Sequence, residues 1–225
     1  MSSKKISTRE VIVKRAVEMF SEHGVEAIPL YKVAADLGIS PGNLTYYFPN
    51  KTALLRELVA RLDQDLAALI EGQNDPTDPD NVAGLLTDIF RLMWSNRYFF
   101  SATLAIAQIE SDFTKDYFRV RSKVRTLTKQ VLQKTIDDGH MRAVRAPNTI
   151  DLLADNLWSV WVDCINTVQL EEMGGTVSDN RAIYVCAVHH VSVLEPYCSA
   201  AFARRMFMNL EGLVGSMSAG DVQSD

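Results

Sequence analysis

The sequence lacks several features that mark common classes of protein. It has no run of about 18 apolar residues, so we expect no membrane span. Its first nine residues lack the apolar segment of a secretory signal. Only three cysteines occur, an odd number without the spacing of a metal site. We therefore expect a reduced, cytoplasmic protein with no cofactor.

Signatures of catalysis are also missing. There is no Gly-x-Ser-x-Gly elbow, no phosphate-binding loop and no His-Glu-x-x-His segment. Cys186, His189 and His190 fall within about one helical turn, but no acidic or sulfur partner stands at a matching spacing elsewhere. We predict neither a metal site nor an enzyme.

The alternation typical of β-strands is absent, whereas apolar residues recur every three to four positions. Capping and breaking residues predict four N-terminal helices, which begin near Ser7 or Thr8, Pro29, Ser40 and Lys51. Six more helices are predicted at about 82–95, 97–110, 114–138, 148–173, 178–197 and 199–214. The sequence therefore predicts an all-α protein.

Charge is divided unevenly along the chain. The net charge is −5, but residues 1–53 hold seven Lys and Arg against five Asp and Glu, which leaves −7 for the rest. An N-terminal part of net charge +2 can approach phosphate while the acidic body stays away from it. Because this difference in charge is small, it supports phosphate binding only together with a stronger sequence motif.

That stronger motif is the segment 38–51, which is typical of the turn and second helix of a helix-turn-helix. Asn43 and Thr45 project from the outer face of the short helix and are candidate base readers. Leu44 and Phe48, four residues apart, are predicted to face the core.

Neighbouring residues are predicted to bind the DNA backbone or to lie close to it. Pro41 and Gly42 start the helix, and Gly42 removes a side chain where the helix approaches the groove. Tyr46 and Tyr47 carry hydroxyls that can reach phosphates, and Lys51 can hold a phosphate at the head of the next helix. Ordinary packing is the alternative for the two tyrosines. An N-terminal arm of Lys4, Lys5 and Arg9 either adds salt-dependent attraction or is simply solvated.

These residues resemble the tetracycline-repressor-like (TetR) family of regulators. The family pattern Ile-Ala-x-x-x-Gly-Val-Ser is matched by Val-Ala-Ala-Asp-Leu-Gly-Ile-Ser at 33–40, and x-Gly-x-Leu-Tyr-Tyr-His-Phe-x-x-Lys is matched without gaps at 41–51. Three positions depart from the pattern: Pro29 replaces Thr, Thr45 replaces Tyr and Tyr47 replaces His. These departures concern which DNA is bound and not whether DNA is bound.

The resemblance implies a three-helix helix-turn-helix DNA-binding domain at 1–53, a larger helical ligand-binding and dimerisation domain at 54–215, and a flexible tail at 216–225. It implies a ligand-responsive regulator, most simply a repressor that binds a near-palindromic double-stranded operator as a homodimer. A small apolar or aromatic molecule would release it. An activator of the same architecture, or a helical protein-binding scaffold, remains an alternative.

Large side chains interspersed with polar ones in the middle helices suggest the effector pocket. The candidate ligand-binding residues are Met93, Trp94, Phe99, Phe100, Leu104, Gln108, Tyr117, Phe118, Trp158 and Asp163. Their alternative role is ordinary core packing.

The last two long apolar helices are predicted to form the homodimer surface as a four-helix bundle. The candidate residues are Trp161, Ile165, Val168, Val185, Val188, His189, Ser192 and Val193. Intramolecular core is again the alternative for each of them.

A basic run at 119–129 is surrounded by acidic residues at 110–116 and 137–138. It predicts a solvated helix face with local ion pairs.

Overall fold

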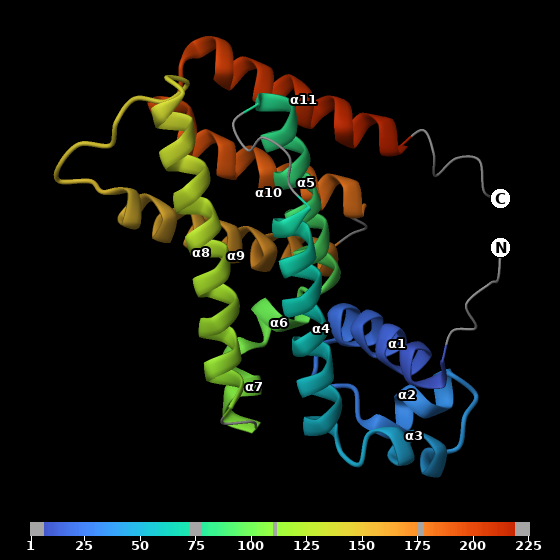
Figure 1. The fold of residues 1–225 in the computed structure, drawn as a ribbon. Helices are drawn as coiled ribbons and strands as arrows, with labels where there is room; N and C mark the ends of the chain where they lie inside the picture. The colour runs from blue at the N-terminus through green and yellow to red at the C-terminus, as the bar shows by residue number, and fades with distance from the viewer. Residues whose placement is uncertain (1–6, 73–77, 110–111, 175–177, 219–225) are drawn as a thin grey trace. The chain divides into compact units, whose positions relative to one another are not determined.

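The computed structural model describes residues 7–72, 78–109, 112–174 and 178–218. Within these ranges the chain forms eleven α-helices, one 3-10 turn and no strand, which confirms the all-α prediction (Figure 1). No helix in these ranges has the length and hydropathy that a membrane crossing requires. Packing divides the chain into two units, one of residues up to Asp65 with Ser95–Phe118, the other of Leu66–Trp94 with the chain after Phe118.

The first unit contains α1 (Thr8–His23), α2 (Leu30–Asp36), α3 (Pro41–Tyr47), the start of α4 (Lys51–Glu71), α6 (Tyr98–Ser101), α7 (Thr103–Ile109) and the start of α8 (Phe113–Asp137). Helix α1 begins at a capping box, in which the side chains of Ser7 and Glu10 each accept from the other's backbone N–H. It ends at Gly24, whose φ of +83° favours glycine. The predicted start and stop are both confirmed.

The core of this unit brings together apolar residues from α1 to α4. Its fully or almost fully buried members include Ile12, Ala16, Phe20, Val33, Leu44, Phe48, Leu54 and Leu58. Outside the core, Arg15 joins α1 to α2 because its guanidinium donates to Asp36 at 2.9 Å, and it also donates to Glu18 of its own helix at 2.8 Å. The Asp36 contact is a charge-assisted hydrogen bond between the two helices that precede α3.

One predicted helix, 97–110, is two helices in the structure. Ala102 leaves the helical conformation, with φ −104° and ψ 17°, and separates α6 from α7. The Thr103 hydroxyl donates to the carbonyls of Phe99 and Phe100, both at 2.9 Å. The prediction of a single helix was wrong because no glycine or proline marks this break.

The second unit contains α5 (Pro79–Ser95), α9 (Ile150–Gly174), α10 (Asp179–Leu194), the 3-10 turn Glu195–Tyr197 and α11 (Ala200–Ser218), with the remainders of α4 and α8. Helix α10 packs against both α9 and α11. Helix α5 starts three residues earlier than predicted, because Asp78 accepts from the backbone N–H of Asp80 at 2.8 Å and Pro79 fits the first turn. Helix α11 continues past the predicted end at residue 214.

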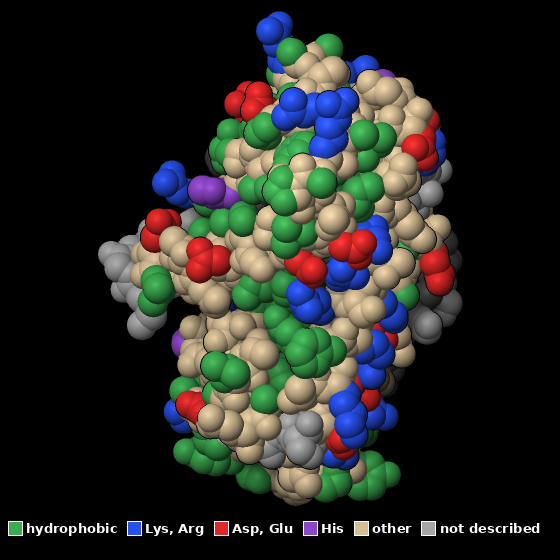
Figure 2. Space-filling model, turned by 90° about the vertical axis from the view of Figure 1, so that its left-hand side faces the viewer, with side chains coloured by type: hydrophobic (Ala, Val, Ile, Leu, Met, Phe, Trp, Pro, Cys, Tyr) green, Lys and Arg blue, Asp and Glu red, His purple; other side chains and the backbone are tan. Residues whose placement is uncertain are grey.

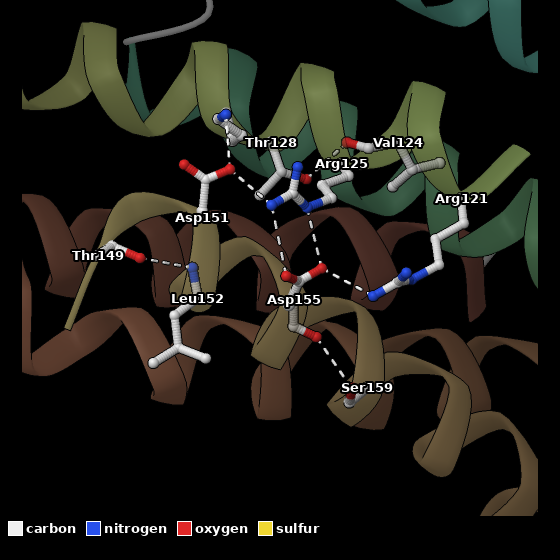
Figure 3. Close-up of polar contacts among 10 residues, drawn as sticks. Arg121, Val124, Arg125, Thr128, Thr149, Asp151, Leu152, Asp155 and Ser159 are labelled. Carbon is white, nitrogen blue, oxygen red and sulfur yellow. Dashed lines mark hydrogen bonds and ion pairs between the residues drawn. The ribbon is translucent and has the colours of Figure 1, made fainter. Parts of the chain in front are cut away.

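An ion-pair network joins α8 to α9 within this unit (Figure 3). The Arg125 guanidinium contacts Asp151 at 2.6 Å and Asp155 at 3.0 Å, Arg121 contacts Asp155 at 2.8 Å, and Lys129 contacts Asp151 at 2.8 Å. Lys129 and Arg125 lower the pKa of the Asp151 carboxyl.

These partners differ from the predicted ones, since both aspartates come from α9 and not from the neighbourhood of the basic run. Local pairs such as Lys134 with Asp138 at 3.0 Å are present as well. On the face shown in Figure 2, Lys and Arg side chains alternate with Asp and Glu side chains. Within the run, Arg121, Arg125 and Lys129 are paired with aspartates of α9.

Candidate DNA-binding site and ligand cavity

The short helix α3 is defined by local signals on both sides. Gly38, with φ +66°, ends the turn after α2. Ser40 then caps α3, because its hydroxyl accepts from the backbone N–H of Asn43 at 3.1 Å, and Pro41 occupies the first helical turn. The helix therefore starts where the sequence predicts.

Helix α3 has one buried face and one exposed face. Leu44 and Phe48 are each 1% exposed and belong to the core of the first unit, as predicted. On the other face Asn43 and Thr45 are exposed, and Tyr46 is 81% exposed. Such a helix presents polar and aromatic side chains on a fixed support, which suits insertion into a DNA groove.

The remaining predicted contact residues of α3 extend this exposed face. Pro41 and Gly42 are exposed at its start. The rings of Tyr46 and Tyr47 meet edge to face with centroids 5.1 Å apart, and Tyr47 is half-buried. The Thr45 hydroxyl donates to the Gly42 carbonyl at 3.2 Å, so its oxygen remains an acceptor.

Lys51 begins α4, as predicted, but its ammonium group lies inward. It donates to the Val25 carbonyl and lies 5.5 Å from the centre of the Phe20 ring. Burial lowers its pKa, and the charge of Glu26 partly offsets this effect. A phosphate contact from Lys51 thus requires a change of its rotamer.

Two residues near α3 have structural features that the sequence did not reveal. Asn50 caps α4 by accepting from the Ala53 backbone N–H at 2.8 Å. Tyr31 is 61% exposed in the first turn of α2, behind Pro29. Its unusual exposure for an aromatic residue is visible only once the packing of α2 is known.

The proposed N-terminal arm is only partly described. Lys4 and Lys5 lie outside the described residues. Arg9 stands in the first turn of α1, where it forms an ion pair with Glu57 at 2.8 Å and lies over the Phe48 ring. Its contribution to an arm stays a prediction.

Six of the ten predicted ligand-binding residues lie in the first unit. Phe99 and Phe100 are buried, and Phe99 also contacts the ring of Tyr117 with centroids 6.0 Å apart. Leu104 is 80% exposed and Phe118 is 56% exposed, while Gln108 is also exposed.

The other four lie in the second unit. Met93, Trp94 and Trp158 are buried there, and Asp163 is exposed. The Trp94 indole donates to Asp179 at 2.7 Å, which links α5 to the start of α10. The aromatic members at 94 and 158 thus contribute to packing, and a ligand role for any of the four stays a prediction.

An apolar cavity of about 60 Å³ is present in the second unit, among α5, α8, α9 and α10. None of the ten predicted residues lines it. The described side chains that line it are almost all aliphatic, and the imidazole of His190 lies among them. The sequence favours an interface or surface position for His190 over a metal site, but the side chain is buried in this wall.

The chain matches two protein-family models. The family model described as "Bacterial regulatory proteins, tetR family" matches residues 12–58, which include α1 to α3 and the start of α4. A second model, described as "Bacterial transcriptional repressor", matches residues 61–206. The chain belongs to the TetR family.

Solved structures agree with this assignment. A TetR-family transcriptional regulator from Marinobacter aquaeolei VT8 is 22% identical, with a TM-score of 0.73 over 92% of this chain and 98% of that chain. A gamma-butyrolactone receptor (ArpA-like protein) is 14% identical, with a TM-score of 0.66 over 93% and 97%. The fatty acid degradation regulator FadR from Bacillus halodurans is 17% identical, with a TM-score of 0.63 over 85% and 97%.

At these identities the likeness shows the fold. No curated protein sequence matches the chain significantly. As a TetR-family member the protein is a helix-turn-helix transcription regulator, a class that is not enzymatic.

The predicted dimer residues of this TetR-family protein fall into two groups. Trp161, Ile165 and Val168 of α9 are each at most 2% exposed within the second unit, so they are intramolecular core. The candidates on α10 are more accessible, since His189 and Ser192 are exposed. Half-buried side chains accompany them at Val185, Val188 and Val193.

Possible metal ligands do not converge in the described part of this regulator. No group of three His, Cys, Asp or Glu side chains there could hold an ion. Cys186 and His190 are buried, whereas His189 is exposed.

Proposed function

We propose that this TetR-family regulator is a repressor that binds a near-palindromic operator as a homodimer and is released by a small apolar molecule. We further propose that it acts in the cytoplasm. The observation that carries the proposal is the two-sided character of α3. Its Leu44 side is part of the core, and its Asn43 and Tyr46 side is open to DNA.

The exposed face divides into two kinds of DNA contact. Asn43 and Thr45 can form hydrogen bonds with base edges, which carry sequence information. The Tyr46 and Tyr47 hydroxyls suit phosphate oxygens, which carry affinity and register. Lys51 joins them once its ammonium leaves the Val25 carbonyl.

Dimerisation is supported by the accessible side of α10. A single helix-turn-helix binds weakly, and a dimer places two recognition helices about one turn of DNA, roughly 34 Å, apart. His189 and Ser192, with the half-buried valines beside them, offer a surface of mixed polarity for this contact. Leu170 of α9 is 69% exposed and is a further candidate.

Release by a ligand needs a mechanical connection to α3. Helix α4 follows α3 after three residues and, like α8, has residues in both packing units without interruption. A ligand that favours one position of α4 therefore changes the separation of the two recognition helices. It must bind more tightly to the form that does not bind the operator, because otherwise no equilibrium shifts. The gamma-butyrolactone receptor among the structural relatives is named for a small, weakly polar molecule, which agrees with an apolar effector.

The Tyr46→Phe variant tests the role of α3. Removing a hydroxyl that binds phosphate should weaken binding to DNA upstream of the protein's own gene by about tenfold or more, since hydrogen bonds to charged groups contribute about 1.5–3 kcal/mol. Thermal stability should not change, because the side chain is 81% exposed. The matched control is Tyr197→Phe, which removes a hydroxyl in the second unit that accepts from Asn148 at 3.3 Å. Equal operator affinity of the two variants would contradict the assigned role of Tyr46.

A further inference from the structure

The described side chains that line the cavity of the second unit are mainly aliphatic. Aliphatic side chains come from α5 (Leu85, Ile89), α8 (Leu127, Val131) and α9 (Leu157). Thr128 also lines it, but its hydroxyl donates to the Val124 carbonyl of its own helix at 2.9 Å. Among the described residues, none that lines the cavity carries a carboxylate, ammonium or guanidinium group.

His190 is the exception in this wall. It is 8% exposed, and its Nδ1 atom is buried without a hydrogen-bond partner in the described part of the chain. The ring is held by Phe90, whose ring meets it edge to face with centroids 5.5 Å apart. Buried polar atoms are almost always satisfied, so an orphaned one in a residue that lines a cavity indicates a missing partner. Nδ1 itself is covered, so a partner in the cavity reaches it only after the imidazole ring turns toward the cavity.

The imidazole is neutral under physiological conditions. Burial lowers the pKa of His190 to about 4. A neutral imidazole has one donor and one acceptor nitrogen, so Nδ1 can pair with an oxygen that donates or with one that accepts. A hydroxyl group satisfies either tautomer, because it both donates and accepts.

Water is a poor occupant of this site. A buried water molecule commonly makes about three hydrogen bonds. Among the described side chains that line the cavity, only His190 and the remaining acceptor capacity of Thr128 are available. An organic molecule can satisfy His190 with one atom while its carbon atoms contact the aliphatic wall.

The size of the cavity restricts the shape of that molecule. An apolar cavity of about 150 Å³ can bind benzene, and this one is smaller, at about 60 Å³, and partly open. It therefore accommodates the end of a linear chain more readily than a ring. A charged end group is excluded, because no described residue of the wall offers an ionic partner to compensate its burial.

We propose that this cavity binds the hydroxyl end of a neutral, unbranched aliphatic molecule, with His190 Nδ1 as its hydrogen-bond partner. This inference rests on the proposed function, since it names the chemical class of the effector. The aliphatic wall contributes affinity, and His190 selects an alcohol over a hydrocarbon, an acid or an amine of the same length.

The test is a titration of the full-length, ¹⁵N-labelled protein with 1-hexanol, observed at the ring nitrogens of His190 by NMR. The Nδ1 resonance should shift in a saturable way. Hexanoate, hexylammonium and benzyl alcohol should bind at least tenfold more weakly. No saturable shift with 1-hexanol, or equal binding of hexanoate, would overturn the proposal.

Two variants separate hydrogen bonding from packing. His190→Asn keeps a polar atom near the position of Nδ1 and should retain 1-hexanol binding within about threefold. His190→Leu removes it and should weaken binding by at least tenfold, with circular dichroism as the check of folding. Undiminished binding to a folded His190→Leu protein would overturn the proposal, and the wild-type titration decides alone if that variant does not fold.

A parallel operator-binding measurement distinguishes the two proposals. If 1-hexanol binds at His190 but does not release operator DNA, the site stands and its role as the effector site fails. If the protein binds operator but no probe moves the His190 resonance, the site fails and the DNA-binding function stands.

Discussion

Lowering the pH from 7.5 to 5 should destabilise the protein mainly through one buried side chain, His190. In the unfolded chain this imidazole titrates at its ordinary pKa of 6.5, and in the folded protein burial lowers the pKa to about 4. Between these two values the unfolded state binds the proton and the folded state does not. Folding stability is therefore complete above pH 6.5 and falls as the pH decreases through this window.

The magnitude follows from the difference between the two pKa values. At 1.36 kcal/mol per unit, the full displacement corresponds to about 3 kcal/mol below pH 4. At pH 5 the expected loss is about 2 kcal/mol, a sizeable part of the stability of a typical domain. Solvent screening is small, because the ring is 8% exposed and no charged side chain of the described residues lines the adjacent cavity.

Urea denaturation at pH 5 and pH 7.5, at one fixed protein concentration, measures this loss. The His190→Asn variant is the matched control, because its amide does not titrate and its stability should be nearly equal at the two values. Carboxylates with lowered pKa values, such as those of Asp36 and Asp151, lose their contribution only below their ordinary pKa of 3.8. The reasoning is refuted if the wild type and His190→Asn lose the same stability between pH 7.5 and 5.

Three substitutions test other parts of the account. Gly42→Ala should leave the fold unchanged or stabilise it by up to about 1 kcal/mol, since the added methyl meets only the Ser40 hydroxyl at 3.9 Å. Its operator affinity in a gel shift should fall, and full affinity would show that Gly42 does not approach the DNA. Gly139→Ala should destabilise the protein by about 1–2 kcal/mol in thermal unfolding, because the φ of Gly139 is +77°. The control is Gly84→Ala, inside α5 with free space around it, which should not destabilise the protein. A larger loss of stability for Gly84→Ala than for Gly139→Ala would disprove this explanation. Arg125→Gln should lower the unfolding temperature more at low than at high salt, because it removes contacts with Asp151 and Asp155, and a salt-independent change would point to packing instead.

The parts of the fold that depend on local chemistry were predictable from the sequence. Ser7 and Ser40 cap helices, Gly24 ends α1 and Gly38 ends the turn after α2, both at positive φ, so the boundaries of α1 and the start of α3 follow from adjacent residues. The division of residues 97–110 at Ala102 was not predictable. No breaker residue marks it, and the Thr103 hydroxyl bond to the Phe99 carbonyl that accompanies the break is known only from the structure.

The sites show the same contrast. The exposed face of α3 follows from the spacing of Leu44 and Phe48, because two residues four positions apart define the buried side of a helix. The cavity depends on side chains from four helices far apart in the sequence, and only packing brings them together around His190. Aromatic content alone could not identify this wall, which is mainly aliphatic.

The central claim is that this TetR-family protein binds a specific operator through α3. The most direct test is a gel shift of DNA upstream of its own gene against random duplex DNA, repeated over a range of salt concentrations. We expect the upstream DNA to bind at least a thousandfold more tightly at physiological salt, with affinity for both DNAs falling as salt rises. Equal affinity for the two DNAs at every salt concentration would contradict the claim.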